Sequence, residues 1–147
     1  MYDLLKHTHS GLRWLLLIFI VIAIANAFMK KNSATEYSKS DKMPVLLTLI
    51  FTHIQILIGL VLYFISPRVS FHAGFMKEAA SRFYGIEHIS MMLIAVILIT
   101  IGYSKSKRQT DIGKKHSTVF FYYLIGFIIM MVSIPWPFRA ALGGGWF

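Results

Sequence analysis

The sequence predicts an all-α, polytopic membrane protein in which four transmembrane helices form an up-down-up-down bundle. The chain of 147 residues is 56% hydrophobic, whereas soluble domains are about 45–50% apolar. Its four longest apolar stretches each run for about 17–22 residues, which is the length that a membrane-spanning helix needs. We therefore expect one domain over residues 1–147, with spans at about 9–29, 44–66, 82–104 and 116–135.

The first two spans carry recognisable boundaries. Two lysines at 30–31 follow the first span at once and suit the membrane surface. The preceding Ala-Asn-Ala at 25–27 is typical of a signal-peptide cleavage site, but the lysines favour a retained helix. Ser40 or Asp41 can cap the second span, and the Ser-Pro pair at 66–67 ends it.

The last two spans follow an amphipathic segment, 67–82, that is expected to lie along the membrane surface. A short basic loop separates the third span from the fourth, and short loops favour antiparallel neighbours. Two prolines within 134–137 end the fourth span, because proline cannot continue a helix. We expect a flexible tail after them, in which Trp146 and Phe147 are available as membrane anchors.

The net charge of +9 indicates topology rather than nucleic-acid binding. Nine basic residues lie in or beside the loops after the first and third spans, and six lie on the opposite side. By the positive-inside rule these two loops are cytoplasmic and both termini are outside. We expect the protein in a bacterial inner membrane, with the lipid bilayer as its surroundings.

Small and polar residues mark the helix faces that pack inside a membrane bundle. In the third span they recur every three or four residues, at Gly85, His88, Met92, Ala95, Ile99 and Gly102. A similar stripe in the second span includes Gln55, and His53 lies about a third of a turn from it. Each helix carries one histidine in or at the edge of its span: His9, His53, His88 and His116.

These four histidines are the candidate ligands of a haem iron. The chain has no cysteine, which excludes iron–sulfur clusters and covalently attached c-type haem. Any haem would therefore be held non-covalently, as haem b in one or two copies, with His9, His53, His88 and His116 as candidate axial ligands. The alternatives are that these histidines hydrogen-bond the helices together, or that they bind copper or zinc without a porphyrin. By depth at ~1.5 Å per residue, His9 with His88 is the best matched pair and His53 with His88 is the next.

Other polar residues could serve the same site. Arg13 and Arg82 are candidate partners for haem propionates, because guanidinium groups match carboxylates. Glu87 points about 100° away from His88, so we expect it to pair with Arg82 or Arg13, or to carry protons. Met92 lies one turn from His88 and is either a weak ligand or a packing residue.

Several segments together resemble a known group of proteins: HSGLRW (9–14), HIQILIGLVLYF (53–64), RFYGIEH (82–88), KH (115–116) and IPWPFR (134–139). They are similar to short four-helix membrane proteins of Bacteroidota-type bacteria that are described as cytochrome b or cytochrome-b-like. The resemblance covers nearly the whole chain and implies the four-helix fold and haem ligation by the four histidines. The paired histidines on single helices of larger respiratory cytochromes b are absent, which argues against a quinone-cycle role.

The leading hypothesis is a membrane b-type cytochrome that transfers single electrons, an electron carrier rather than a stand-alone enzyme. Its expected partners are a quinone or a respiratory complex, and it can act as an oligomer. The alternative is an accessory subunit of a membrane complex that binds no haem. A third hypothesis is a small transporter or proton relay that uses Glu87 and the histidines.

Overall fold

The computed structural model describes residues 1–33 and 35–146, so Phe147 lies outside the described residues. Its main elements are α1 (Tyr2–Lys30), α2 (Lys39–Ile65), α3 (Ala79–Arg82), the π-helical turn η2 (Phe83–Glu87), α4 (His88–Arg108) and α5 (Ile112–Ser133). Two 3₁₀ turns, η1 (Phe75–Lys77) and η3 (Ala140–Leu142), lie in the connections. Within the described residues, four helices, counting α3 to α4 as one, are long and apolar enough to cross a membrane. The prediction of an all-α membrane bundle is confirmed.

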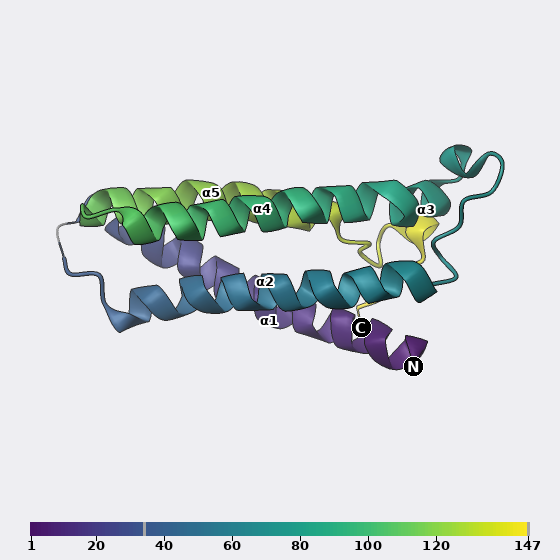
Figure 1. Cartoon of the computed structure of the whole chain (residues 1–147), viewed down its shortest axis with the longest axis horizontal. Helices are drawn as coiled ribbons and strands as arrows, with labels where there is room; N and C mark the ends of the chain where they lie inside the picture. The colour runs from purple at the N-terminus through teal and green to yellow at the C-terminus, as the bar shows by residue number, and fades with distance from the viewer. Residues whose placement is uncertain (34, 147) are drawn as a thin grey trace.

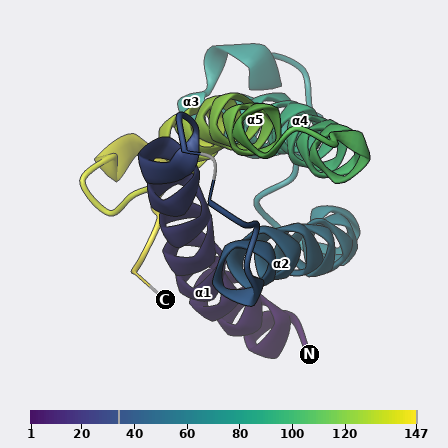
Figure 2. The same cartoon turned by 90° about the vertical axis from the view of Figure 1, so that its left-hand side faces the viewer.

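The four long helices form two layers, with α4 and α5 in one and α1 and α2 in the other (Figure 1). Both termini lie at one end of the bundle, which we call the terminal end. The α1–α2 and α4–α5 connections lie at the opposite end, the loop end. Seen from the loop end in Figure 2, α1 runs obliquely: its C-terminal end lies near α5, and its N-terminal end lies below α2.

The core is formed by mostly apolar side chains from all four long helices. Ile20, Ala95, Ile99 and Tyr123 are fully buried. The Tyr123 hydroxyl crosses the bundle and donates a hydrogen bond of 2.9 Å to the Val45 carbonyl oxygen. Gly85, Ala95, Ile99 and Gly102 of the predicted packing stripe are buried. This stripe therefore faces the interior, as its spacing predicts.

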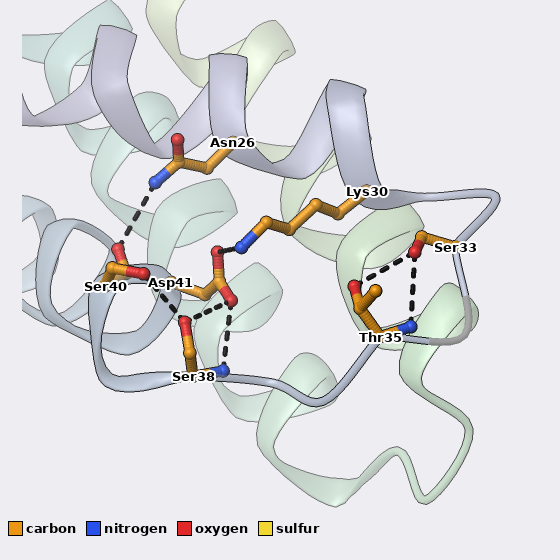
Figure 3. A network of polar contacts seen from close by, with 7 residues as sticks. All are labelled: Asn26, Lys30, Ser33, Thr35, Ser38, Ser40 and Asp41. Carbon is orange, nitrogen blue, oxygen red and sulfur yellow. Dashed lines mark hydrogen bonds and ion pairs between the residues drawn. The ribbon is translucent and has the colours of Figure 1, made fainter.

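At the loop end, α2 begins earlier than the sequence suggests, and its N-cap is Ser38 rather than Ser40 or Asp41. The reason is visible in Figure 3, where the Ser38 backbone N–H and hydroxyl both donate to Asp41 Oδ2, at 3.0 and 2.8 Å. Lys30 at the end of α1 donates to Asp41 Oδ1 at 2.7 Å. Asp41 thus fixes the start of α2 and joins it to α1.

A second contact at the loop end compensates for a proline. Pro44 lies inside α2, and because proline has no N–H, it leaves the Ser40 carbonyl without its helical partner. Asn26 of α1 donates its side-chain amide to that carbonyl at 3.2 Å (Figure 3). The two helices are therefore held together where the backbone of α2 would otherwise be unsatisfied.

At the terminal end, the tail expected to be flexible is instead packed against the bundle. The Trp146 ring lies 6.2 Å from the Trp14 ring and 6.1 Å from the Trp136 ring, between centroids. A Cβ atom on Gly144 would lie 1.8 Å from the Pro135 carbonyl oxygen. Only glycine permits this close approach of the tail to the segment that follows α5.

Candidate functional site

A cavity of about 390 Å³ lies at the terminal end between α1, α2 and α4. Residues 143–145 of the tail also line it. Ligand and cofactor sites typically have volumes of about 300–1,000 Å³. Five of the predicted site residues line this cavity: His9, Arg13, Gln55, His88 and Met92.

His9 lies on α1 and packs closely against α2. A Cβ atom on Gly59 would approach His9 Cε1 to 3.3 Å, so the glycine leaves just enough room for the imidazole. Within the described part of the chain, His9 Nδ1 is buried and has no hydrogen-bond partner. Such atoms are rare in folded proteins because an unpaired buried polar group costs about 1–3 kcal/mol. This nitrogen is among the ring atoms nearest to Gly59, so it lies on the side of the imidazole that packs against α2.

His88 is the first residue of α4 and follows the π-helical turn η2. Its Nδ1 donates a hydrogen bond of 2.7 Å to the Ser133 carbonyl oxygen. In a neutral ring this bond puts the lone pair on Nε2. Metal-binding histidines commonly donate their other N–H to a backbone carbonyl in this way, which fixes both tautomer and ring orientation.

The local sequence explains why this contact forms. Ser133 is the last residue of α5, and carbonyls in the last turn of a helix have no helical donor. Pro135 follows and prevents α5 from continuing. On the other side, the π-helical turn is tied to α2, because the Tyr63 hydroxyl donates to the Gly85 carbonyl at 2.8 Å. π-Helical turns are rare and occur frequently at functional sites.

The His9 and His88 rings lie close together, one on α1 and the other at the start of α4. Their ring centroids are 6.5 Å apart and the ring planes are inclined by 74°. Two imidazoles that bind one metal ion from opposite sides, with bonds of about 2.0–2.1 Å, have centres about 6–6.5 Å apart. The separation therefore suits a shared metal ion, and the donors present fit the iron of a haem.

Gln55 and Met92 complete the middle of the cavity. Gln55 Nε2 donates to the His9 carbonyl oxygen at 2.9 Å, which joins α2 to α1. Its Oε1 is buried and, among the described residues, has no hydrogen-bond partner. Met92 lines the cavity one turn beyond His88. Gln55 thus offers a free acceptor to a ligand, and Met92 offers an apolar wall.

Arg13 lies at the cavity wall and is buried. Its Nη2 donates to the carbonyls of Gly145 and Trp146, at 3.4 and 2.8 Å. The guanidinium carbon also lies 5.5 Å from the ring centroids of both Trp14 and Trp136. The tail is therefore fastened to the cavity wall by an arginine.

Four other predicted site residues do not line the cavity. His53 is exposed on α2, where its Nδ1 bonds to the Leu49 carbonyl within the same helix at 2.8 Å. Arg82 Nε donates to Glu87 Oε1 at 2.6 Å, which is one of the two ion pairs that the sequence left open for Glu87. His53, Arg82 and Glu87 therefore form their hydrogen bonds away from His9 and His88.

His116 lies at the loop end, far along the bundle from His9 and His88. Its ring centroid is 4.9 Å from that of Tyr37. The Lys115 ammonium nitrogen also packs on the Tyr37 ring, 4.9 Å from its centroid. Burial, assisted by the charge of Asp41, raises the pKa of Tyr37 to about 12. Tyr37 therefore stays neutral at physiological pH and packs as an aromatic side chain.

Sequence reasoning missed several residues that line the cavity: Tyr2, Lys6, Tyr63, Arg68 and the glycines of 143–145. Arg68 follows the end of α2 directly, so its place at the terminal end follows from the topology. The run of glycines before Trp146 was a signal for close backbone packing. Comparison of the chain with protein-family models, curated proteins and solved structures finds no match.

Proposed function

We propose that this chain is a membrane-bound b-type cytochrome in which His9 and His88 hold one haem iron. The observation that carries the proposal is the close pair of imidazoles, 6.5 Å apart, at the wall of a cavity. The resemblance of the chain to cytochrome-b-like membrane proteins points the same way. Bound haem would supply reversible one-electron transfer at its iron.

The number of available donors favours haem over an isolated metal ion. A protein zinc site needs at least three side-chain ligands. Among the described residues, no group of three or more histidine or acidic side chains is close enough to hold a metal ion. A porphyrin supplies four nitrogens of its own, so two imidazoles are sufficient.

The chain would contribute orientation and exclusion of water. The Ser133 carbonyl fixes the His88 ring, and hydrogen bonds to metal-binding histidines raise their basicity as ligands. Leu16, Leu17, Ile89 and Ile134 line the cavity with apolar side chains. An apolar shell limits solvent access and tunes the reduction potential of the iron.

The proposal includes a cellular setting. With the basic loops in the cytoplasm of a bacterium, both termini and the cavity would lie at the outer side of the inner membrane. The electron donor would be a membrane quinol or a respiratory complex, and the acceptor would be on the outer side.

The deciding experiment is an absorption spectrum of protein purified after expression with added haem precursor. We expect a reduced-minus-oxidised spectrum with a b-type α-band and about one haem per chain. Protein that is folded by circular dichroism but shows no α-band under these conditions would contradict the proposal.

A second candidate is an accessory membrane subunit without haem. It is favoured by the fact that the same groups join helices: His88 bonds α4 to the end of α5, and Gln55 bonds α2 to α1. Histidine and glutamine side chains commonly hold membrane helices together. Purification within a larger complex that has no haem in this subunit would support this alternative.

A further inference from the structure

The wall of the cavity combines cationic side chains with apolar ones. Lys6, Arg13 and Arg68 line it, and no Asp or Glu is present among the described residues that do. Leu62 and Val96 are among its apolar lining residues. An occupant that matches this distribution has a large apolar body and an anionic edge.

Arg13 is a buried cation without a buried anion. Its side chain is about 9% exposed, and no ion pair with Asp or Glu is formed by it among the described residues. Its Nε is buried and, within the same part of the chain, has no hydrogen-bond partner. Burying an uncompensated charge is costly. Two backbone carbonyls satisfy only part of the guanidinium.

Arg68 lines the same cavity and follows the end of α2. Its Nη1 donates to the Tyr84 hydroxyl at 2.7 Å and to the Leu142 carbonyl at 3.5 Å. Its Nη2 would lie 3.9 Å from a Cβ atom on Gly143, so the guanidinium is held against the tail. The arginine fork has five N–H donors, and these contacts leave several of them unused.

The other outer arginines are already occupied. Arg82 is paired with Glu87 at 2.6 Å. Arg139 donates to the carbonyls of Val132 and Ile134, at 3.0 and 3.3 Å. Neither lines the cavity. Of the two arginines that the sequence suggests as propionate partners, Arg13 lines the cavity and Arg82 does not.

We infer that Arg13 and Arg68 form a carboxylate-binding subsite in the cavity wall, with Lys6 of the same lining adding positive charge. The inference rests on the proposed function, because the carboxylates would be the two propionates of haem. Arginine binds carboxylates through paired, charge-assisted hydrogen bonds. A phosphate of an anionic lipid has related chemistry and is distinguished below.

The test compares ferric haem with its dimethyl ester, in which both carboxylates are blocked. Each is titrated into the full chain, purified in a neutral detergent from cells grown without haem precursor. We expect haem to bind about tenfold more tightly than the ester, since charge-assisted hydrogen bonds are the stronger class.

The Arg68→Gln variant should weaken haem binding by about tenfold and leave ester binding unchanged. Arg68 is exposed, so this variant is expected to fold. Arg82→Gln is the matched control and should change neither affinity. The Arg13→Gln variant should act like Arg68→Gln if the tail remains packed, which fluorescence of Trp146 and its neighbours reports.

Equal affinities for haem and its ester, unchanged in Arg68→Gln, would overturn the subsite and leave the proposed haem function intact. Failure of both porphyrins to bind would overturn the proposed function and the subsite together. A third arm adds phosphatidylglycerol to the titration. Loss of the preference for haem over its ester when this lipid is present, together with Arg68-dependent lipid binding, would assign the arginines to lipid phosphate instead.

Discussion

The two ends of the bundle each bury a histidine nitrogen that has no partner among the described residues, yet they differ in what surrounds it. At the loop end, His116 Nε2 is buried beside the Tyr37 ring. At the terminal end, His9 Nδ1 is buried where a second imidazole and a cavity lie next to it. Of these two histidines, His9 is therefore the stronger candidate for binding a ligand, because a cavity and a second imidazole lie beside it.

The difference has a structural origin in the polar groups at each end. At the loop end, Asp41, Lys30 and Ser38 satisfy one another (Figure 3). At the terminal end, the acceptor Gln55 Oε1 and the donor Arg13 Nε are left unpaired. Polar groups that pair with each other stabilise the fold, whereas unpaired ones at a cavity are available to a ligand.

The largest expected effect separates the two ends by their histidines. His9→Ala and His88→Ala should each lower haem content more than about tenfold, since even outer-shell partners of ligands contribute 10–100-fold. His116→Ala and the exposed His53→Ala should retain it. Haem per chain, measured from the reduced spectrum, checks this. If only the His116→Ala variant lost haem, the haem site would lie at the loop end and the assignment to His9 and His88 would be wrong.

A substitution at the loop end should affect stability without affecting haem. Asp41→Asn removes a carboxylate that is 2% exposed and accepts hydrogen bonds from Lys30 and Ser38. We expect a loss of about 1–3 kcal/mol in unfolding free energy, because Lys30 is left without its anion. Denaturation in mixed detergent measures this loss. An exposed control, Asp3→Asn, should change stability by less than about 0.5 kcal/mol.

A smaller effect is expected from filling the space beside His9. A Cβ atom in Gly59→Ala would lie 3.3 Å from His9 Cε1, so the ring must shift by a few tenths of an ångström. We expect haem affinity to fall by roughly two- to fivefold, at or below the low end of overpacking costs. Gly11→Ala is the matched control, since its Cβ atom would meet nothing within 4 Å. Equal affinities in the two variants would show that His9 is not closely held by α2.

The smallest effect concerns alkaline pH at the loop end. Burial raises the pKa of Tyr37 from 10.0 to about 12, so the folded state favours the protonated phenol. This contribution to stability is present below pH 10 and is lost as pH rises towards about 12. The melting temperature of the unsubstituted chain should therefore fall more steeply than that of Tyr37→Phe in this window. Parallel pH profiles would indicate that Tyr37 is not buried in solution.

The sequence predicted the helices well and their ends less well. The spans follow from apolar length, and the interior face of the third span follows from the small residues between Gly85 and Gly102. The predicted start of α2 was wrong because single-residue capping preferences favoured Ser40 or Asp41. In the structure the cap is Ser38, whose backbone N–H and hydroxyl both donate to the Asp41 carboxylate. Depth along the helices also selected His9 and His88 as the best matched histidines.

The depth of a histidine along its helix does not determine the direction in which its side chain points. His53 was an alternative partner for His88 because its depth is similar, but it points to the exposed face of α2 and bonds to Leu49. The tail was expected to be flexible, since nothing local orders a run of glycines. Its order depends on Arg13 and Trp14, which are more than a hundred residues away in the chain.

The sequence by itself determined the membrane bundle, because helix length and the cost of unpaired backbone in lipid allow few other structures. It also determined which helix carries each histidine. Only the tertiary structure decided which two histidines lie close together. It also decided which arginine forms an ion pair with Glu87 and which arginine lines the cavity. These choices depend on helix rotation and on contacts between distant segments, and neither is encoded in the hydrophobic pattern of a single span.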